Sequence, residues 1–400
     1  MMDIKRTNRS AALRVLHEKG GMSRKRLAET IKLTPAAITK IVGEMLGEGL
    51  LQEGGAVPSG NAGRREILVE LNPRFRCALG VLLNLQQAII SAVWLDGSVI
   101  FSEKIELPAK AEAEPTVAML SERVLALAEE NGLRREMILG LGLAVRGITA
   151  PDGRVLKNSF GMLSEADVPL CRMFEEATGF RCVMANNVRA LFAAQMFVER
   201  DRDEACQFFL RCEYGIGASL SIDRQIWHGV SQQCAEIGHI PVIRRGGKLC
   251  SCGKSGCLET IASPAALRED ALALLSEEGT PVLWKLSREK KPEELDIEDI
   301  LNAAMAGDAA VAELVDRAVA ALGSALKSVV YLVDPDRIIL YGRMFDNSYY
   351  LSRLLTEMRE GVDTRHSVIV EKSPYNHQLE DKAASLLVVD DFFLNGGIQA

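Results

Sequence analysis

Long apolar runs and a disulfide pattern are both missing from this sequence. None of its apolar stretches approaches the roughly 18 residues that a membrane helix needs. The basic residues near the N-terminus do not precede an apolar stretch typical of a signal peptide. The nine cysteines are an odd number and six of them are scattered, which is typical of reduced thiols. Repeats and low-complexity tracts are missing too. We therefore expect a cytoplasmic globular protein of two or three domains.

Charge is distributed unevenly along the chain. The formal net charge is −7, yet residues 1–65 contain 12 Lys and Arg against 6 Asp and Glu. A small basic head on a larger acidic body is typical of a nucleic-acid-binding domain joined to a soluble one. Solvated helices are often basic as well, so charge alone does not decide the function.

The basic head has the pattern of a winged helix-turn-helix. Helices are expected at 8–19, at 24–30 after the cap Ser23, and from Pro35 to about Gly47 after the cap Thr34. Apolar residues at i, i+3, i+4 and i+7 predict one buried stripe on the third helix: Ile38, Ile41, Val42 and Met45. Two strands follow, at 50–53 and 66–71, and a Gly/Ser/Pro-rich loop between them predicts a wing.

The other face of the third helix and the wing are the predicted DNA contacts. These candidates are Thr34, Ala36, Thr39, Lys40, Arg64 and Arg65. We expect the basic members to position the head on the phosphate backbone rather than to specify sequence. A helical bundle that binds a protein is the alternative reading of the same segment.

A short segment in the second half of the chain combines a histidine with three cysteines. His239 lies eleven positions before Cys250-Ser251-Cys252, and Cys257 follows Gly253 and Gly256. Thiolates and one imidazole can complete a tetrahedral shell around zinc, and the two glycines allow the chain to fold back. The pattern therefore predicts a structural metal site formed by His239, Cys250, Cys252 and Cys257. The alternative is three small buried cysteines and a core histidine.

The sequence Glu236-Ile237-Gly238-His239, followed by Cys-Ser-Cys-Gly-Lys-Ser-Gly-Cys-Leu-Glu at 250–259, resembles the signature of the ROK family of repressors and sugar kinases. The resemblance covers nearly the whole chain and implies zinc on the four residues above. It also implies that Glu236, His239 and Glu259 face a sugar. The head is similar to that of ROK repressors, including Ser-Arg-x-x-Leu-Ala at Ser23 to Ala28.

The rest of the chain alternates strands and helices, which predicts layered α/β structure. Together with the resemblance, this implies an α/β fold in which a winged helix-turn-helix precedes a two-lobed actin/hexokinase-like ROK domain. We expect the head at 1–72 and the ROK domain at 73–400. Its lobes are expected at about 73–200 with the C-terminal helix, and at 201–380.

The catalytic loops of a ROK sugar kinase are altered in this chain. The first phosphate loop, Asp-x-Gly-Gly-Thr in active kinases, is matched by Leu82-Leu83-Asn84-Leu85-Gln86, which lacks the carboxylate, both glycines and the hydroxyl. The base motif Asn-Asp-x-Asn is matched by Asn186-Asn187-Val188-Arg189, and an amide is no general base. The second phosphate loop begins with Glu213 and Tyr214. We therefore predict no enzymatic activity, while Asn186 and Asn187 join the candidate sugar ligands.

These features predict a sugar-responsive DNA-binding repressor of carbohydrate metabolism genes that acts as a homodimer, with a tetramer as the alternative, on a double-stranded operator. Arg146 and Arg189 would favour an anionic sugar derivative if they border the ligand, although ordinary surface ion pairs explain them equally well. Two alternatives remain open: a bifunctional sugar kinase with a DNA-binding head, and a repressor that responds to a protein partner.

Overall fold

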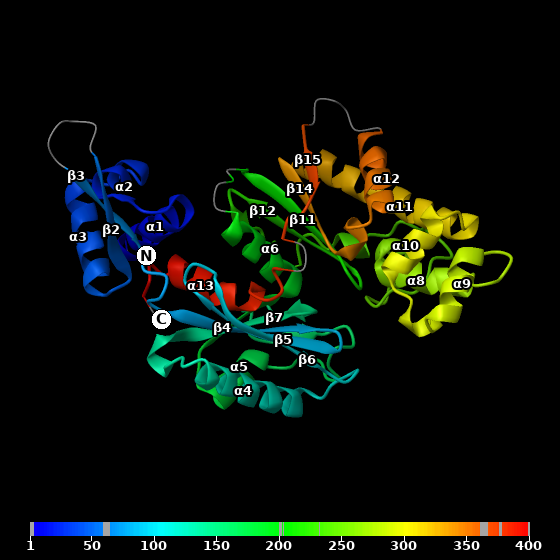
Figure 1. The fold of residues 1–400 in the computed structure, drawn as a ribbon, viewed down its shortest axis with the longest axis horizontal. Helices are drawn as coiled ribbons and strands as arrows, with labels where there is room; N and C mark the ends of the chain where they lie inside the picture. Colours follow the sequence, from blue (N-terminus) through cyan, green and yellow to red (C-terminus); the bar gives the residue numbers. More distant parts are fainter. Residues whose placement is uncertain are drawn as a thin grey trace. The chain divides into compact units, whose positions relative to one another are not determined.

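The computed structural model describes residues 4–58, 65–199, 202, 204–231, 233–360, 367–375 and 378–398. The chain divides into two compact units, and each is treated by itself. The first comprises Met1–Arg202 and Gln378–Ala400, and the second comprises Asp203–His377 (Figure 1). Within the described residues, no helix combines the length and the apolar character that crossing a membrane requires.

The first unit begins with a small head of helices and a three-stranded sheet of order β1-β3-β2. Its elements are α1 (Ile4–Lys19), β1 (Met22–Ser23), α2 (Arg24–Thr30), α3 (Pro35–Gly47), β2 (Leu51–Pro58) and β3 (Arg65–Leu71). The expected start of the first helix at residue 8 is wrong. Lys5 pairs with Glu44 of α3 at 2.9 Å, and this contact between helices lies outside the apolar pattern of α1.

The capping signals of α2 and α3 act as expected. The Ser23 hydroxyl accepts a hydrogen bond from the Arg26 amide, and the Thr34 hydroxyl accepts one from the Ala37 amide. The predicted apolar stripe of α3 is confirmed, because all four residues are buried: Ile38, Ile41, Val42 and Met45.

The remainder of the first unit is a five-stranded sheet of order β10-β7-β4-β5-β6 with helices on both faces (Figure 1). Its elements are β4 (Cys77–Asn84), β5 (Gln87–Trp94), β6 (Val99–Glu106), α4 (Ala113–Glu130), η1 (Arg135–Met137), β7 (Ile138–Val145), β8 (Ile148–Thr149), β9 (Leu156–Asn158), α5 (Leu170–Thr178), β10 (Cys182–Asn186), α6 (Asn187–Val198) and α13 (Ala383–Leu394). Helices α4 and α5 share a core with one face, and α13 packs on the other. β7 is buried along its whole length, and all of β4 except its last residue is buried, as expected for strands covered on both faces.

Glycine in two central strands lets α13 approach the sheet backbone. A Cβ added at Gly142 would lie 1.8 Å from the carbonyl oxygen of Ala384, and one at Gly80 would lie 2.4 Å from the amide nitrogen of Ser385. The Ser385 hydroxyl also lies 2.8 Å from that of Ser91 on β5. The C-terminal helix is therefore seated directly on strands more than 200 residues earlier in the chain.

The second unit is built on a five-stranded sheet of order β13-β12-β11-β14-β15. The apolar side chains of β11 and β14 share one core with the helices between residues 259 and 359. The elements are β11 (Cys206–Cys212), β12 (Ile216–Ile222), β13 (Gln225–Ile226), η2 (Ile237–His239), α7 (Glu259–Ala262), α8 (Pro264–Ala273), α9 (Pro281–Glu289), η3 (Pro292–Glu294), α10 (Ile297–Met305), α11 (Ala309–Val333), β14 (Arg337–Tyr341), η4 (Arg343–Phe345), α12 (Ser348–Arg359) and β15 (Ile369–Lys372).

Candidate functional site

The cysteine loop of the second unit folds back on itself before α7. The Cys250 amide donates to the Lys254 carbonyl at 2.7 Å, and the Gly253 amide donates to the Cys250 carbonyl at 2.9 Å. Gly253 and Gly256 have φ values of 84° and 77°, which glycine adopts without strain. A Cβ at Gly256 would lie 2.1 Å from the Ile243 carbonyl oxygen. Both glycines are thus needed for the return of the chain, as the sequence suggested.

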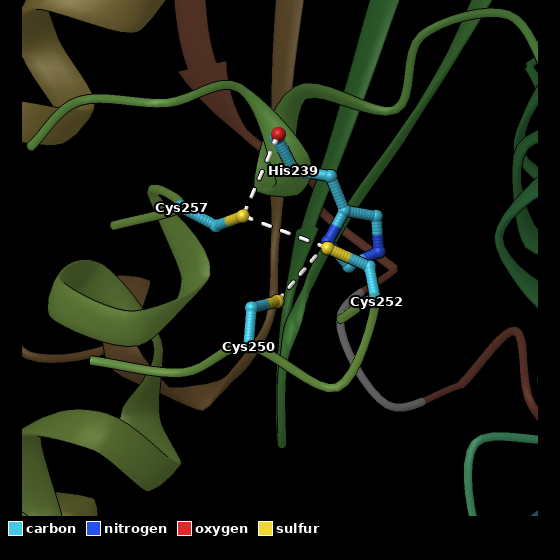
Figure 2. A group of neighbouring side chains, drawn as sticks. All are labelled: His239, Cys250, Cys252 and Cys257. Atoms are coloured by element: carbon cyan, nitrogen blue, oxygen red, sulfur yellow. Dashed lines mark hydrogen bonds between the residues drawn. The ribbon is translucent and has the colours of Figure 1, made fainter. Parts of the chain in front are cut away.

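This turn gathers the four predicted metal ligands. One ligand atom from each of His239, Cys250, Cys252 and Cys257 lies within 4.8 Å of all the others. Figure 2 shows the three thiols and the imidazole turned toward one another. The Cys252 and Cys257 sulfurs are 3.6 Å apart, and Nδ1 of His239 is 3.4 Å from the Cys250 sulfur.

These distances fit a tetrahedral ion better than any bond between the side chains. Ligands at about 2.3 Å from a tetrahedral zinc ion would have sulfurs about 3.8 Å apart. A disulfide would bring them to about 2.0 Å, and all three thiols are free. The set of donor atoms, three sulfurs and one imidazole nitrogen, is also one that zinc prefers. The described residues therefore fit a bound divalent metal of this class.

Whether the thiols of this site are protonated depends on whether a metal ion is bound. Burial raises the pKa of the Cys257 thiol to about 12, and hydrogen bonds with Cys252 and Cys250 act in the same direction. Without a cation, this thiol therefore keeps its proton at neutral pH. A divalent ion would displace that proton, because metals bind the thiolate form.

Glu259 joins the cysteine loop to the turn between β11 and β12. Its Oε2 accepts a hydrogen bond from the Ile216 amide at 3.1 Å, and its Oε1 accepts one from the Ser251 hydroxyl at 3.4 Å. A Cβ at Gly215 would lie 2.3 Å from Oε2, so the close approach of this carboxylate requires glycine there. Glu259 thus has structural contacts in addition to the sugar contact expected for it.

A pocket of about 670 Å³ opens beside the cysteine loop. Its lining includes Tyr214, Leu249, Ser251, Glu259 and Thr260. Glu236, by contrast, is exposed and precedes η2, while His239 at the end of η2 is half-buried. Within the second unit, Glu236 and His239 therefore flank η2, and Glu259 begins α7 beside the cysteine loop.

The other two candidate sugar residues belong to the first unit, at the junction of β10 and α6. The Asn186 side chain caps α6 by accepting from the Val188 amide at 2.8 Å, and it donates to the Gly147 carbonyl at 2.7 Å. Asn187 is only 4% exposed and donates to the Asn84 side chain at 3.0 Å. The sequence did not single out Asn84 as a partner; its position at the end of β4, parallel to β7 and β10, was the available signal.

Glu213 has a specific partner across the second sheet. It follows β11, and its Oε1 accepts a hydrogen bond from the Arg343 amide, just after β14, at 3.0 Å. Gly342 has a φ of 133°, and a Cβ there would lie 1.9 Å from the Cys212 carbonyl oxygen. The ends of these parallel strands are thus held together by a carboxylate of the chain itself.

The sequence profile of the ROK family matches residues 87–386. The chain belongs to the ROK family. Among curated proteins, it is 28% identical over 341 residues to the DNA-binding transcriptional dual regulator NagC of Escherichia coli K12, covering 85% of this chain and 81% of NagC. It is 25% identical over 402 residues to the DNA-binding transcriptional repressor Mlc of the same organism, covering 99% of this chain and 95% of Mlc.

Solved structures confirm the ROK fold. A ROK family transcriptional regulator described as a homologue of E. coli Mlc aligns over 98% of both chains with a TM-score of 0.80 and 22% identity. A ROK family glucokinase from Streptomyces griseus, solved with glucose and AMPPNP, aligns with a TM-score of 0.67 and 21% identity. That alignment covers 98% of the glucokinase but 78% of this chain.

The predicted DNA contacts on the ROK head are exposed where the structure describes them. Thr34, Ala36, Thr39 and Lys40 all lie on the exposed face of α3. The Thr39 hydroxyl donates to the Pro35 carbonyl at 2.7 Å, and the first turn of α3 contains no acidic residue. Arg64 and the side chain of Arg65 lie outside the described residues, so the wing contacts stay predictions.

Proposed function

We propose that this ROK protein is a sugar-responsive, DNA-binding transcriptional repressor of carbohydrate metabolism genes. The observation that carries the proposal is the head on the ROK fold. The likeness to a ROK transcriptional regulator extends over 98% of this chain, whereas the likeness to a ROK glucokinase covers 78%. NagC and Mlc are named as DNA-binding transcriptional regulators, which supports the same role here.

Residues 1–72 form the DNA-binding domain in this proposal, and residues 73–400 form the sensor. The sensor's lobes are about 73–200 with the C-terminal helix, and 201–380. The N-terminal face of α3 enters the major groove, and the wing contacts the neighbouring backbone. The contacts are assigned to Thr34, Ala36, Thr39, Lys40, Arg64 and Arg65.

The metal is proposed to be a structural zinc ion held by His239, Cys250, Cys252 and Cys257. Zinc binding through Nδ1 fixes the tautomer and the orientation of the His239 ring, which leaves Nε2–H as a donor for a sugar hydroxyl. Glu236 and Glu259 supply carboxylate acceptors for other hydroxyls, and Asn186 and Asn187 supply amides.

The ROK domain is proposed to have no kinase activity. Asn187 cannot remove a proton from a sugar hydroxyl, and its amide is already engaged with Asn84. Glu213 lies in the stretch that matches the second phosphate loop of ROK kinases, and its carboxylate accepts a hydrogen bond from the Arg343 amide. Its negative charge would repel the phosphates of a nucleotide there. A cytoplasmic homodimer would present two heads to a pseudo-palindromic operator.

Fluorescence anisotropy with the DNA upstream of the protein's own gene tests the proposal. The protein is titrated at two salt concentrations, and a panel of neutral sugars, sugar acids and sugar phosphates is then added. We expect tight, salt-sensitive binding that one of these ligands changes. If no operator is found, either there or in a genome-wide selection of bound fragments, the regulator role fails. Operator binding that no ligand changes would indicate that the regulator responds to a protein partner.

The likeness to a glucokinase favours one competing function, a sugar kinase with a DNA-binding head. A coupled ADP-release assay over common hexoses distinguishes the two. We expect no turnover above the background without protein. Turnover that is lost in Asn187→Ala would support the kinase instead.

A further inference from the structure

Helix α1 contacts the rest of the first unit and attaches the head to it. Two of its side chains, Arg9 and His17, are 1% and 7% exposed although both are polar. Arg9 contacts the chain just after α13, and His17 contacts the end of α6 and also the Phe393 ring of α13. These two contacts connect the head to α13 and to α6.

Arg9 makes the first attachment. Its Nε–H donates to the Gly396 carbonyl, just beyond the end of α13, at 2.7 Å. Its two other nitrogens donate to the Glu48 carboxylate, at the end of α3, at 2.8 and 2.5 Å. A Cβ at Gly397 would lie 2.4 Å from a Leu50 methyl group, so the chain after α13 fits closely against the head. One guanidinium therefore connects the ends of α3 and α13.

His17 makes the second attachment. Its Nε2 lies 3.2 Å from the Phe197 carbonyl oxygen, so the nitrogen must donate its proton there. This carbonyl is in the last turn of α6, where helix carbonyls lack partners within the helix. The His17 ring also lies 4.0 Å from the Phe197 ring, centroid to centroid. The head thus caps α6 at its C-terminal end.

The opposite end of α6 holds the candidate sugar residues. Asn186 caps its first turn and Asn187 is its first residue, so the helix runs directly from these amides to His17. α13, by contrast, is fixed to the sheet through the close contacts at Gly80 and Gly142. One attachment of α1 is therefore to a fixed helix and the other to a helix that begins at the candidate ligand site.

We propose that α6 acts as a lever that couples the Asn186–Asn187 turn to the DNA-binding head through His17, with the Arg9 attachment to α13 as its pivot. Arg9 and His17 are eight residues apart on α1, about 12 Å along the helix axis. A shift of α6 by about 1 Å, common for packed helices, would tilt α1 by about 5°. Through Glu48, α3 tilts with it. This inference concerns the regulation of the proposed function and rests on it for its biological meaning.

The test measures hydrogen exchange of the amides in α1 and α3 by mass spectrometry on the full chain, without DNA or sugar. Asn186→Ala removes the cap and the bond to Gly147. We expect exchange in the head to rise at least about fivefold. The matched control is Asn347→Ala, which removes the same type of cap from α12 in the second unit and should leave the head unchanged.

The deciding comparison places Asn186→Ala in a His17→Ala background. If His17 transmits the effect, Asn186→Ala adds nothing further to head exchange there. An equal increase in both backgrounds, or an unchanged head in the single variant, overturns the lever. Should His17→Ala not fold, His17→Phe keeps the ring and removes the donor, and Asn186→Asp keeps the cap and removes the bond to Gly147.

Failure of the lever is distinguishable from failure of the proposed function. Operator binding that responds to a ligand, with no coupling in the exchange experiment, keeps the regulator and rejects the lever. Coupling in a protein that binds no DNA keeps the lever and rejects the regulator.

Discussion

The side-chain amide of Asn187 donates a hydrogen bond to the amide oxygen of Asn84 at 3.0 Å. The two residues end up together because β4 and β10 are both parallel to β7, so their carboxyl ends reach one edge of the sheet. Two neutral amides can approach in this way without a cation between them, whereas two carboxylates at this distance would repel each other. The pair is therefore an uncharged contact that joins the ends of β4 and β10.

Asn187→Asp should destabilise the protein without making it a kinase. The new carboxylate would be almost fully buried beside Asn84, and we expect a loss of about 1–3 kcal/mol in the free energy of unfolding at pH 7. Urea unfolding measures this loss, and the ADP-release assay should stay at background because Glu213 still occupies the Arg343 amide.

The control is Asn347→Asp, which places the same new charge at the half-buried cap of α12, beside the Asn302 side chain. There it should be neutral or slightly stabilising, because aspartate is a good N-cap near the positive end of a helix. Sugar-dependent ADP release by the Asn187→Asp variant would contradict our account of the loop.

Much of the fold was predictable from local signals. The caps Ser23 and Thr34 mark the starts of α2 and α3, and the all-apolar stretch at Ile138–Val145 is one buried strand. The return of the chain at Gly253 and Gly256 was likewise predictable, because glycine between clustered cysteines has few other uses.

Contacts between distant segments were not predictable in this way. Nothing in the sequence near Gly142 indicates that the backbone of Ala384 lies against it. The same holds for Glu259, whose contacts with Ile216 and Ser251 depend on how the β11–β12 turn meets the cysteine loop. Such placements follow from the packing of whole elements, and a local pattern does not encode them.

The metal site predicts a specific loss in Cys257→Ser. The variant lacks one of the four ligands, so its zinc content, measured by elemental analysis, should fall from about one ion per chain to well below half. Its thermal unfolding temperature should fall as well, because the ion holds the loop between η2 and α7. Acidification should release zinc from the native protein, since protons compete with the metal for the thiolates.

Cys234→Ser is the control for this experiment, because Cys234 lies outside the cluster of four ligands. It should keep its zinc. Equal zinc content in both variants, or a native protein purified under zinc-replete conditions without the metal, would show that the four residues do not hold it.

Lys40→Ala should weaken operator binding without changing which sequence is preferred. Lys40 is exposed on the N-terminal half of α3, and we expect it to contact a phosphate. Losing one phosphate contact should reduce the slope of log affinity against log salt by about 1. Anisotropy titrations at several salt concentrations measure the slope.

Lys104→Ala on β6 removes the same charge from an exposed position on the body. Its salt slope should equal that of the native protein. If both variants lower the salt slope by the same amount, the effect of Lys40 comes from net charge and α3 is not the contact surface.

Asp390→Asn should stabilise the protein at neutral pH. Burial raises the pKa of the Asp390 carboxyl on α13 above its ordinary value of 3.8, and the charge of Arg14 on α1 only partly opposes this shift. Between 3.8 and the raised value, the native state binds a proton that the unfolded state has lost. Stability is therefore lost as the pH rises through this window, and the carboxylate remains a cost above it.

The advantage of Asp390→Asn over the native protein should therefore grow as the pH rises above the ordinary value of 3.8. Urea unfolding of both proteins at pH 5, 6, 7 and 8 gives the difference. Asp391→Asn is the control: its carboxylate pairs with Arg181 on the surface at 2.8 Å, and losing such a pair costs only about 0–1 kcal/mol. A less stable Asp390→Asn at pH 7 would mean that attraction to Arg14 outweighs burial. In that case, this carboxylate would be a third attachment of the head to the rest of the first unit, beside those of Arg9 and His17.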